Sequence, residues 1–283
     1  MDKITILSET PESRVELHEN EDGRTFVRKI SQNPNYNQKL RREIEKQHKF
    51  YDRNLAALKT PKIYFYEYLR GLFFADMERI KAQSVADTIV SHSRMYHRLW
   101  AAYLCNNLAG GTVSSGNVNV LREIETVDRL LWEKNIPVIR AAVKTLYEGK
   151  EQITVHLMSN HGNLSFDNIL LSDTECQLID FGECFCECAE ADYATLLLDS
   201  MFCCSFRNKD IDSDARQMLD ALTNDILESY AKDYGDPTDL YKIMLLKVLR
   251  TYVCSKEESE TAFLDNILIY IMRKIRQLAL RPT

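Results

Sequence analysis

The sequence predicts an α+β protein whose strands lie in its first 80 residues and whose helices fill most of the remainder. The N-terminal part contains short runs of β-branched and aromatic residues separated by polar turns, a pattern typical of antiparallel hairpins. From about residue 193 the apolar side chains instead recur at intervals of three and four, as on the buried face of a helix. We therefore expect a β-rich part over residues 1–80 and a mainly helical part over residues 81–283.

The expected elements follow from these patterns in chain order. Strands are predicted over residues 14–18, 24–30, 62–68 and 72–80, and polar or glycine-containing turns separate each pair. Residues 37–50 have a helical composition, with Leu40 and Ile44 on one side. Further helices are predicted over residues 95–108, 120–146, 193–202, 214–234, 239–253 and 260–280.

The composition is that of an acidic chain with few linkers. Its 42 acidic and 36 basic side chains give a net charge of −6, which disfavours nucleic acid as a partner. Glycine and proline are few, at 9 and 6. The chain lacks an apolar run of about 18 residues, and its first residues lack the apolar core of a signal peptide. We therefore expect a soluble, cytoplasmic protein with no membrane partner, and the sequence leaves its oligomeric state open.

A hairpin is predicted between two polar segments near the middle of the chain. Two largely apolar runs, 169–171 and 176–179, flank a polar turn around Thr174. Asn168 and Asp180 each stand six residues from Thr174, so antiparallel pairing brings them to the same open end. An amide oxygen and a carboxylate suit Mg²⁺, which takes its other ligands from water and phosphates. Asn168 and Asp180 are therefore the predicted metal ligands.

The segments at this hairpin resemble two motifs of one enzyme superfamily. His161-Gly162-Asn163-Leu164-Ser165-Phe166-Asp167-Asn168 is similar to a catalytic loop His-Gly-Asp-x-x-x-x-Asn, and Ile179-Asp180-Phe181-Gly182 is similar to the metal-binding loop that follows it. Together they resemble the aminoglycoside phosphotransferase and choline kinase branch of the kinase-like superfamily, because protein kinases usually carry arginine where Gly162 stands. The resemblance implies a two-lobed fold, with a small antiparallel N-terminal lobe and a mainly helical C-terminal lobe.

The same resemblance implies a reaction and a nucleotide site. The reaction is transfer of the γ-phosphoryl group of ATP, with Mg²⁺, to a hydroxyl of a small molecule such as a sugar, amino alcohol, antibiotic or nucleoside. A phosphate-contacting lysine is implied on the second strand, where we favour Lys29 over Arg28. Its glutamate partner is implied on the next helix, where we favour Glu43 over Glu45.

Two further parts of the nucleotide site are implied less directly. The turn that covers the phosphates has no glycine here, so the hydroxyls of Ser8, Thr10 and Ser13 are expected to donate hydrogen bonds in its place. The strand over 72–80 resembles the segment that enters the hinge between lobes. Adenine is then expected to meet backbone groups near Glu78 to Ile80, with Met77 as a wall of its pocket.

One residue departs from the family pattern. Asn163 stands where the catalytic aspartate would accept the proton of the attacking hydroxyl, and a carboxamide cannot take that proton at neutral pH. This chain is therefore expected to be inactive or strongly impaired, with His161 bracing the loop. Either the asparagine was introduced into an otherwise active enzyme, which the intact Lys29, Asn168 and Asp180 favour, or the chain is a nucleotide-binding pseudokinase that serves as a regulatory or interaction module. An atypical protein kinase is a further alternative.

The eight cysteines complete the pattern. Cys184, Cys186 and Cys188 alternate along one short segment, and Cys203 and Cys204 are adjacent. We expect reduced thiols because no secretory signal is present. The paired Cys-x-x-Cys spacing of a zinc site is absent, so zinc is not expected.

Overall fold

A computed structural model describes residues 3–52, 58–91, 104–105, 114–118, 121–131, 136–148, 153–171, 176–182, 184–207, 209–255 and 257–280. The chain forms two compact units. The first comprises residues 1–93 and 161–183, and the second comprises residues 94–160 and 184–283. The predicted catalytic and metal-binding loops therefore belong to the same unit as the N-terminal strands. The expected lobe boundary at residue 80 stays a prediction.

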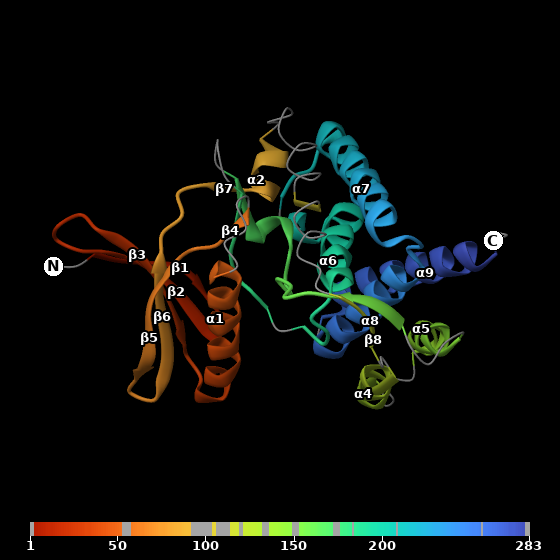
Figure 1. Cartoon of the computed structure of the whole chain (residues 1–283), viewed down its shortest axis with the longest axis horizontal. Coiled ribbons are helices and arrows are strands. Elements are labelled where there is room, and N and C mark those ends of the chain that lie inside the picture. Colours follow the sequence, from red (N-terminus) through yellow and green to blue (C-terminus); the bar gives the residue numbers. More distant parts are fainter. Residues whose placement is uncertain are drawn as a thin grey trace. The chain divides into compact units, whose positions relative to one another are not determined.

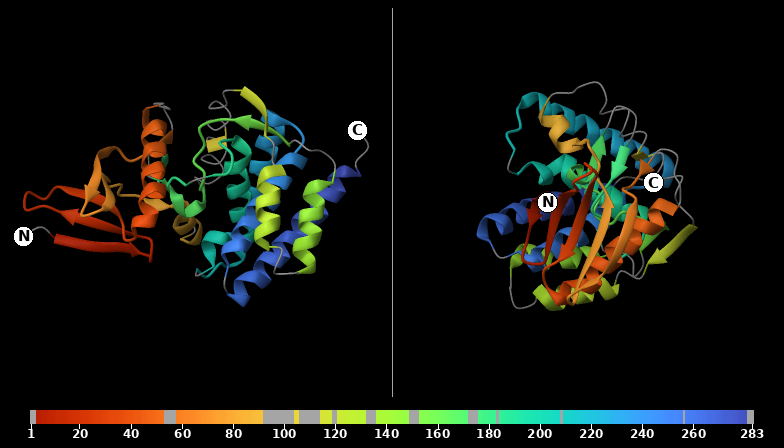
Figure 2. Two further views of the ribbon diagram at one scale, coloured as in Figure 1. Left: turned by 90° about the horizontal axis from the view of Figure 1, so that it is seen from below. Right: turned by 90° about the vertical axis from the view of Figure 1, so that its left-hand side faces the viewer.

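The first unit is built on a five-stranded antiparallel sheet with the order β1-β2-β3-β6-β5. The strands are β1 (Lys3–Glu9), β2 (Ser13–Glu19), β3 (Thr25–Ser31), β5 (Ile63–Leu69) and β6 (Leu72–Glu78). They lie side by side in the right-hand view of Figure 2. The four predicted strands are all present, and β1 adds a fifth at one edge.

Helix α1 (Asn37–Asp52) lies along one face of this sheet, after a short 3-10 helix, η1 (Pro34–Tyr36) (Figure 1). An apolar core joins helix and sheet, made of Leu40, Ile44, Phe73, Ala75 and Met77. The side chain of Asn37 fixes the start of the helix, since its amide donates to the carbonyl of Gly71 at 2.8 Å and accepts from the amide of Phe73 at 2.9 Å. These contacts set which residues of α1 face the sheet.

A smaller sheet carries the predicted hairpin. Its order is β4-β11-β10-β7, with β4 (Leu58–Lys59), β11 (Cys176–Leu178), β10 (Ile169–Leu171) and β7 (Gln83–Ser84). Two short helices, α2 (Val85–Val90) and η3 (Phe166–Asn168), pack beside it. Antiparallel pairing of β10 with β11 confirms the hairpin, but its register is shifted by one residue. Ile169 pairs with Leu178, and the Ile179 amide donates to the Asn168 carbonyl, so Asn168 faces Ile179 rather than Asp180. The turn at Thr174 lies outside the described residues.

The second unit is mainly helical. Its elements are β8 (Ser114–Val118), α4 (Leu121–Leu131), α5 (Pro137–Tyr147), β9 (Ile153–Leu157), α6 (Ala189–Phe202), η4 (Cys204–Phe206), α7 (Ser213–Tyr234), α8 (Thr238–Cys254) and α9 (Glu258–Ala279). The four predicted C-terminal helices correspond to α6, α7, α8 and α9. The single helix predicted over 120–146 is wrong, because Pro137 begins a separate helix, α5, where its missing amide hydrogen is tolerated. Most of the helix predicted over 95–108 lies outside the described residues.

Helix α6 is the centre of the second unit. Every residue from Ala189 to Ser200 is buried, and α7 and α8 pack against it. Its buried carboxylate Glu190 accepts a hydrogen bond from the amide of His156 at 3.0 Å, and the His156 ring nitrogen Nδ1 lies 2.6 Å from Glu190. Across the described ranges, no helix is long and apolar enough to cross a membrane.

Candidate active site

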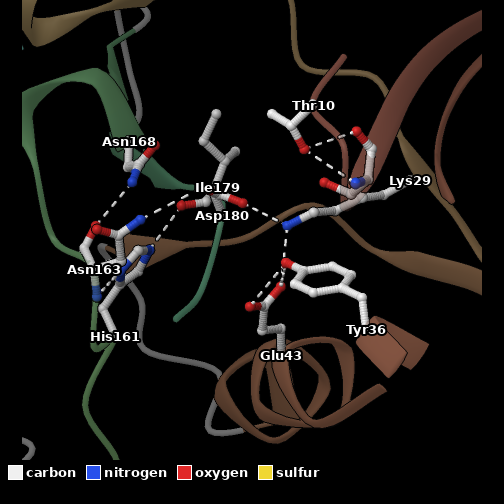
Figure 3. A network of polar contacts seen from close by, with 10 residues as sticks. Thr10, Lys29, Tyr36, Glu43, His161, Asn163, Asn168, Ile179 and Asp180 are labelled. Carbon is white, nitrogen blue, oxygen red and sulfur yellow. Dashed lines mark hydrogen bonds and ion pairs between the residues drawn. The ribbon is translucent and has the colours of Figure 1, made fainter. Parts of the chain in front are cut away.

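Lys29 lies at the centre of a polar network within the first unit (Figure 3). Its side chain leaves β3 on the face covered by α1. Lys29 Nζ donates to Asp180 Oδ1 at 2.6 Å and to Glu43 Oε2 at 3.2 Å. The Lys29 and Glu43 side chains are 13% and 7% exposed, whereas that of Asp180 is 47% exposed. The predicted phosphate-contacting lysine, its glutamate partner and the predicted metal ligand are therefore in direct contact.

The two competing residues face elsewhere. Arg28 points to the opposite face of the sheet, where its guanidinium binds both oxygens of Asp76 at 2.6 and 2.7 Å. Glu45 lies on the exposed side of α1 and binds Arg41 at 2.8 Å. The alternation of side chains along a strand and the helical period of α1 account for both separations. The geometry thus favours Lys29 and Glu43 over the alternatives.

A tyrosine outside the predicted set completes this network. The Tyr36 hydroxyl lies 3.3 Å from both carboxylate oxygens of Glu43. Burial and the charge of Glu43 raise the pKa of Tyr36 to about 12, so its hydroxyl remains a donor. Tyr36 comes from η1, immediately before α1. In the sequence, the one signal for this contact is the position of Tyr36 just before the predicted helix that carries Glu43.

The electrostatics of Lys29 favour a permanent positive charge. Burial lowers the pKa of Lys29, but the attraction of Asp180 and Glu43 more than offsets it, and the pKa lies above its ordinary value. Burial raises the pKa of Glu43, and Lys29 compensates only in part. The compensation at Glu43 is partial because the Lys29 ammonium lies closer to Asp180 than to Glu43. A buried cation next to a half-exposed carboxylate is well placed to meet phosphate oxygens.

His161 braces the predicted catalytic loop from a fully buried position. The backbone amide of Asn163 donates to His161 Nδ1 at 3.2 Å, so this nitrogen is an acceptor. The other nitrogen, Nε2, lies 2.8 Å from the carbonyl oxygen of Ile179 and must therefore be the donor. The imidazole is thus held neutral in one tautomer between the two loops. Both nitrogens are occupied, which fits bracing rather than proton exchange.

Gly162 and Gly182 bring these loops into backbone contact. Gly162 has a φ of +85°, and a Cβ atom there would overlap the carbonyl oxygen of Gly182. A Cβ at Gly182 would in turn lie 2.8 Å from the Cβ of Asn163. Glycine at 162 is therefore required by space as well as by backbone conformation. The Gly182 amide also donates to the His161 carbonyl at 3.1 Å.

The predicted metal-binding loop is further held by helix α1. Lys46 Nζ donates to the carbonyl oxygen of Gly182 at 3.0 Å. Phe181 is buried between the rings of Phe50 and His161, at centroid distances of 5.2 and 4.2 Å. Asp180 itself has a φ of 58°, a left-handed conformation that is uncommon for a residue with a side chain. The contacts on both sides of Asp180 hold this conformation in place. Lys46 was not predicted from the sequence, where it resembles any solvated helix lysine.

Asn163 and Asn168 complete the loop. Asn168 Nδ2 donates to the carbonyl oxygen of Asn163 at 2.8 Å, and Asn163 Nδ2 donates to Asp180 Oδ2 at 3.4 Å (Figure 3). Asp180 is therefore held between Lys29 and Asn163.

The residues present fit a phosphate-bound Mg²⁺ rather than a tightly caged metal. The bond from Asn168 uses its amide nitrogen and leaves its amide oxygen to serve as a ligand. Asp180 supplies one half-exposed carboxylate. No cluster of three or more His, Cys, Asp or Glu side chains suited to a metal occurs within the ranges that the structure describes. One carboxylate and one amide suit a hard ion that takes most of its ligands from phosphates and water.

The predicted phosphate lid is the turn between β1 and β2. Thr10 is committed to that turn, since its hydroxyl accepts from the Ser13 amide at 3.0 Å and lies 3.1 Å from the Ser13 carbonyl. Ser8 lies within β1 and Ser13 begins β2. Glu9 accepts a hydrogen bond from Gln32 at 2.6 Å. Contact of this turn with a phosphate stays a prediction.

The predicted adenine-binding residues lie at the end of β6. Met77 is buried in the core between the sheet and α1. Glu78 is the last residue of the strand, and its amide donates to the Lys62 carbonyl at 2.9 Å. Ile80 follows the strand and is partly exposed. Contact with a nucleotide stays a prediction for all three residues.

Comparisons with known proteins identify the fold of this chain. No family model and no curated protein sequence matches this chain. The chain is similar to the solved structure of the streptomycin-ATP-APH(2")-IIa ternary complex, with 14% identity and a TM-score of 0.57 over 95% of this chain and 91% of that one. It is similar to the GDP and kanamycin complex of APH(2")-IIia, with 14% identity and a TM-score of 0.58 over 97% and 93%. It is also similar to macrolide 2'-phosphotransferase type I, with 13% identity and a TM-score of 0.55 over 94% and 90%.

These likenesses show the fold of the chain. It has the two-lobed kinase-like fold in the form that aminoglycoside and macrolide phosphotransferases share. The fold that the resemblance of the two sequence motifs implied is thereby confirmed.

Proposed function

We propose that this protein is a kinase-like phosphotransferase scaffold that binds ATP and Mg²⁺ and directs the γ-phosphoryl group to a hydroxyl of a small molecule. The observation that carries the proposal is the position of Lys29, whose ammonium group joins Glu43 and Asp180. A structural lysine needs only one buried carboxylate partner. A second, half-exposed partner on the loop that follows the hairpin provides a place where metal and phosphate can meet.

The roles of the residues follow from their contacts. Lys29 would hold phosphate oxygens, while Glu43, itself held by Tyr36, would fix the direction of Lys29. Asn168 and Asp180 would hold Mg²⁺, which when bound neutralises the negative charge of the phosphates. The backbone groups of residues 78–80 would meet the adenine, since a few placed backbone donors and acceptors are enough to orient a small ligand.

Asn163 limits what this chain does with a bound nucleotide. Its carboxamide can hydrogen-bond an acceptor hydroxyl but cannot remove the proton. We therefore propose that phosphoryl transfer by this chain is absent or strongly impaired. The pseudokinase alternative has one observation in its favour: the Asn163 amide donates to Asp180 and so takes part in holding the site together. An atypical protein kinase remains the second alternative.

The acceptor is proposed as a small molecule with a free hydroxyl, such as a sugar, an amino alcohol or an antibiotic. The net charge of −6 disfavours nucleic acid as the acceptor and allows a cationic small molecule. A cytoplasmic location is proposed because ATP is available there and because the cysteines described are all free thiols.

Nucleotide binding is the first test. Thermal unfolding is measured with Mg·ATP, with ATP and a chelator, and without ligand. A ligand present at about 100 times its dissociation constant stabilises the folded state by roughly 2.7 kcal/mol, which is a readily measured shift. Mg·ATP should raise Tm in the parent and in Arg24→Met, which removes an exposed cation just before β3, but not in Lys29→Met. A parent protein that millimolar Mg·ATP leaves unshifted would exclude the proposed nucleotide site.

A further inference from the structure

Three cysteines occupy alternate positions in the segment that leads into α6. Cys184, Cys186 and Cys188 are all free thiols, and they do not form a metal-binding cluster among the residues that the structure places. The proposed phosphotransferase chemistry makes no use of them. Their geometry is nevertheless specific.

The backbone brings Cys186 and Cys188 closer together than an extended chain would. The amide of Cys188 donates to the carbonyl oxygen of Cys186 at 3.1 Å, which closes a three-residue γ-turn. Two extended residues span about 7 Å, beyond the usual Cα separation of a disulfide, and the turn shortens this distance. The side-chain amide of Asn160 donates to the carbonyl oxygen of Cys186 at 3.4 Å and to that of Cys188 at 3.2 Å, and so holds the turn.

The two thiols also interact with each other. The neighbouring Cys188 thiol lowers the pKa of Cys186, while burial opposes this effect. The Cys186 thiol and burial both raise the pKa of Cys188. Cys186 is 8% exposed and Cys188 is fully buried. Cys186 is thus the more acidic and more accessible sulfur, and Cys188 is placed to react with it next.

We propose that Cys186 and Cys188 form an oxidisable dithiol, a modification site whose reactant is hydrogen peroxide. The Cys186 thiolate attacks one peroxide oxygen, the O–O bond breaks, and hydroxide leaves, which gives a sulfenic acid at Cys186. The Cys188 sulfur then attacks the Cys186 sulfur and displaces water. In sum, two thiols and one hydrogen peroxide give one disulfide and two waters. A thiol reductant reverses the reaction by exchange.

The third cysteine is the main competitor. Cys184 is partly exposed, and its thiol donates to the carbonyl oxygen of Cys186 at 2.7 Å. Its sulfur therefore points toward the backbone at Cys186. A disulfide between Cys184 and Cys186, or between Cys184 and Cys188, would contradict the proposal.

The sequence allows a direct test on the full chain. The reduced protein is treated with stoichiometric peroxide, its remaining thiols are blocked, and the denatured chain is cut after glutamate. Cleavage after Glu183, Glu187 and Glu190 separates residues 184–187 from residues 188–190. The proposed disulfide joins these two peptides with the loss of two hydrogens, whereas a Cys184–Cys186 bond stays within the first peptide.

Serine variants identify the two cysteines that form the disulfide. The joined peptides should persist in Cys184→Ser and disappear in Cys186→Ser and in Cys188→Ser. In Cys188→Ser a sulfenic acid should instead accumulate on residues 184–187 and be trapped by dimedone. The parent chain alone also decides the question, since fragmentation of the joined peptides shows which sulfur carries the bond. Oxidation confined to Cys184, to Cys203 or to the exposed Cys254 would overturn the proposal.

Discussion

Replacing Asn163 by aspartate puts a second negative charge beside Asp180. Asn163 Nδ2 lies 3.4 Å from Asp180 Oδ2, so Asn163→Asp exchanges a donor for a carboxylate oxygen of similar size. Without metal, the protein loses a hydrogen bond and gains a repulsion, and we expect it to be less stable than the parent. The two carboxylates together form a stronger ligand set for Mg²⁺. Added Mg²⁺ should therefore recover the lost stability.

The size of this effect follows from the distance and the exposure. Two unit charges 3.4 Å apart repel by about 1.2 kcal/mol in bulk water and about 5 kcal/mol at an effective dielectric constant of 20. The side chain of Asp180 is 47% exposed, so the lower end of this range applies. The lost hydrogen bond contributes about 1 kcal/mol more. We expect a total destabilisation of about 2–3 kcal/mol, or roughly 4–10 °C in Tm.

Unfolding of the parent, Asn163→Asp and Asn163→Ala, with chelator and with Mg²⁺, measures these contributions separately. Asn163→Ala loses the hydrogen bond without adding charge, so it should be destabilised by about 1 kcal/mol and respond to Mg²⁺ as the parent does. Salt should reduce the extra destabilisation of Asn163→Asp, because it screens the repulsion between the two carboxylates.

The same variant tests catalysis. Base catalysis contributes about 10²–10⁴-fold, so turnover of ATP with a suitable acceptor should rise by a factor of that order. If Asn163→Asp and Asn163→Ala are equally stable with chelator and respond equally to Mg²⁺, residue 163 does not face Asp180. If Asn163→Asp binds Mg·ATP normally but turns over nothing across a broad acceptor panel, the pseudokinase alternative holds.

Two further predictions concern the metal ligands and the loop glycine. Asp180→Ala should abolish or severely weaken Mg²⁺-dependent nucleotide binding, because Asp180 would be the charged ligand, and Asn168→Ala should weaken it less. Equal tolerance of both changes in titrations would exclude the proposed metal site. Gly162→Ala should cost about 3–5 kcal/mol in urea unfolding, because its Cβ would overlap the Gly182 carbonyl, whereas Gly23→Ala, at a φ of +78° with open space around it, should cost about 1–2 kcal/mol. Similar costs for the two alanines would show that the loops are not in contact.

The sequence by itself determined the local elements and the chemistry they offer. The alternation in β3 placed Lys29 and Arg28 on opposite faces, and the two polar segments around the hairpin indicated the kinase-like motifs. These features depend on residues near one another in the chain. Their period and turn chemistry are visible without a structure.

Helix boundaries and the pairing register of strands were harder to predict from the sequence. The sequence predicted the hairpin, but the observed strand register differs by one residue from the predicted register. The reason is that a turn of four polar residues allows more than one alignment of the strands. The apolar period across residues 120–146 indicated one helix, although Pro137 begins a second. Local pattern gives the kind of element more reliably than its ends.

Only the tertiary structure decided which side chains meet. Lys29 and Asp180 are 151 residues apart in sequence, and their contact depends on how α1 and the small sheet pack. The core that fixes α1 selected Glu43 over Glu45 and added Tyr36 and Lys46, which no motif distinguishes from surface residues. The physical reason is that a hydrogen bond of about 3 Å requires positions set by long-range packing, while sequence periodicity specifies only the face on which a side chain lies.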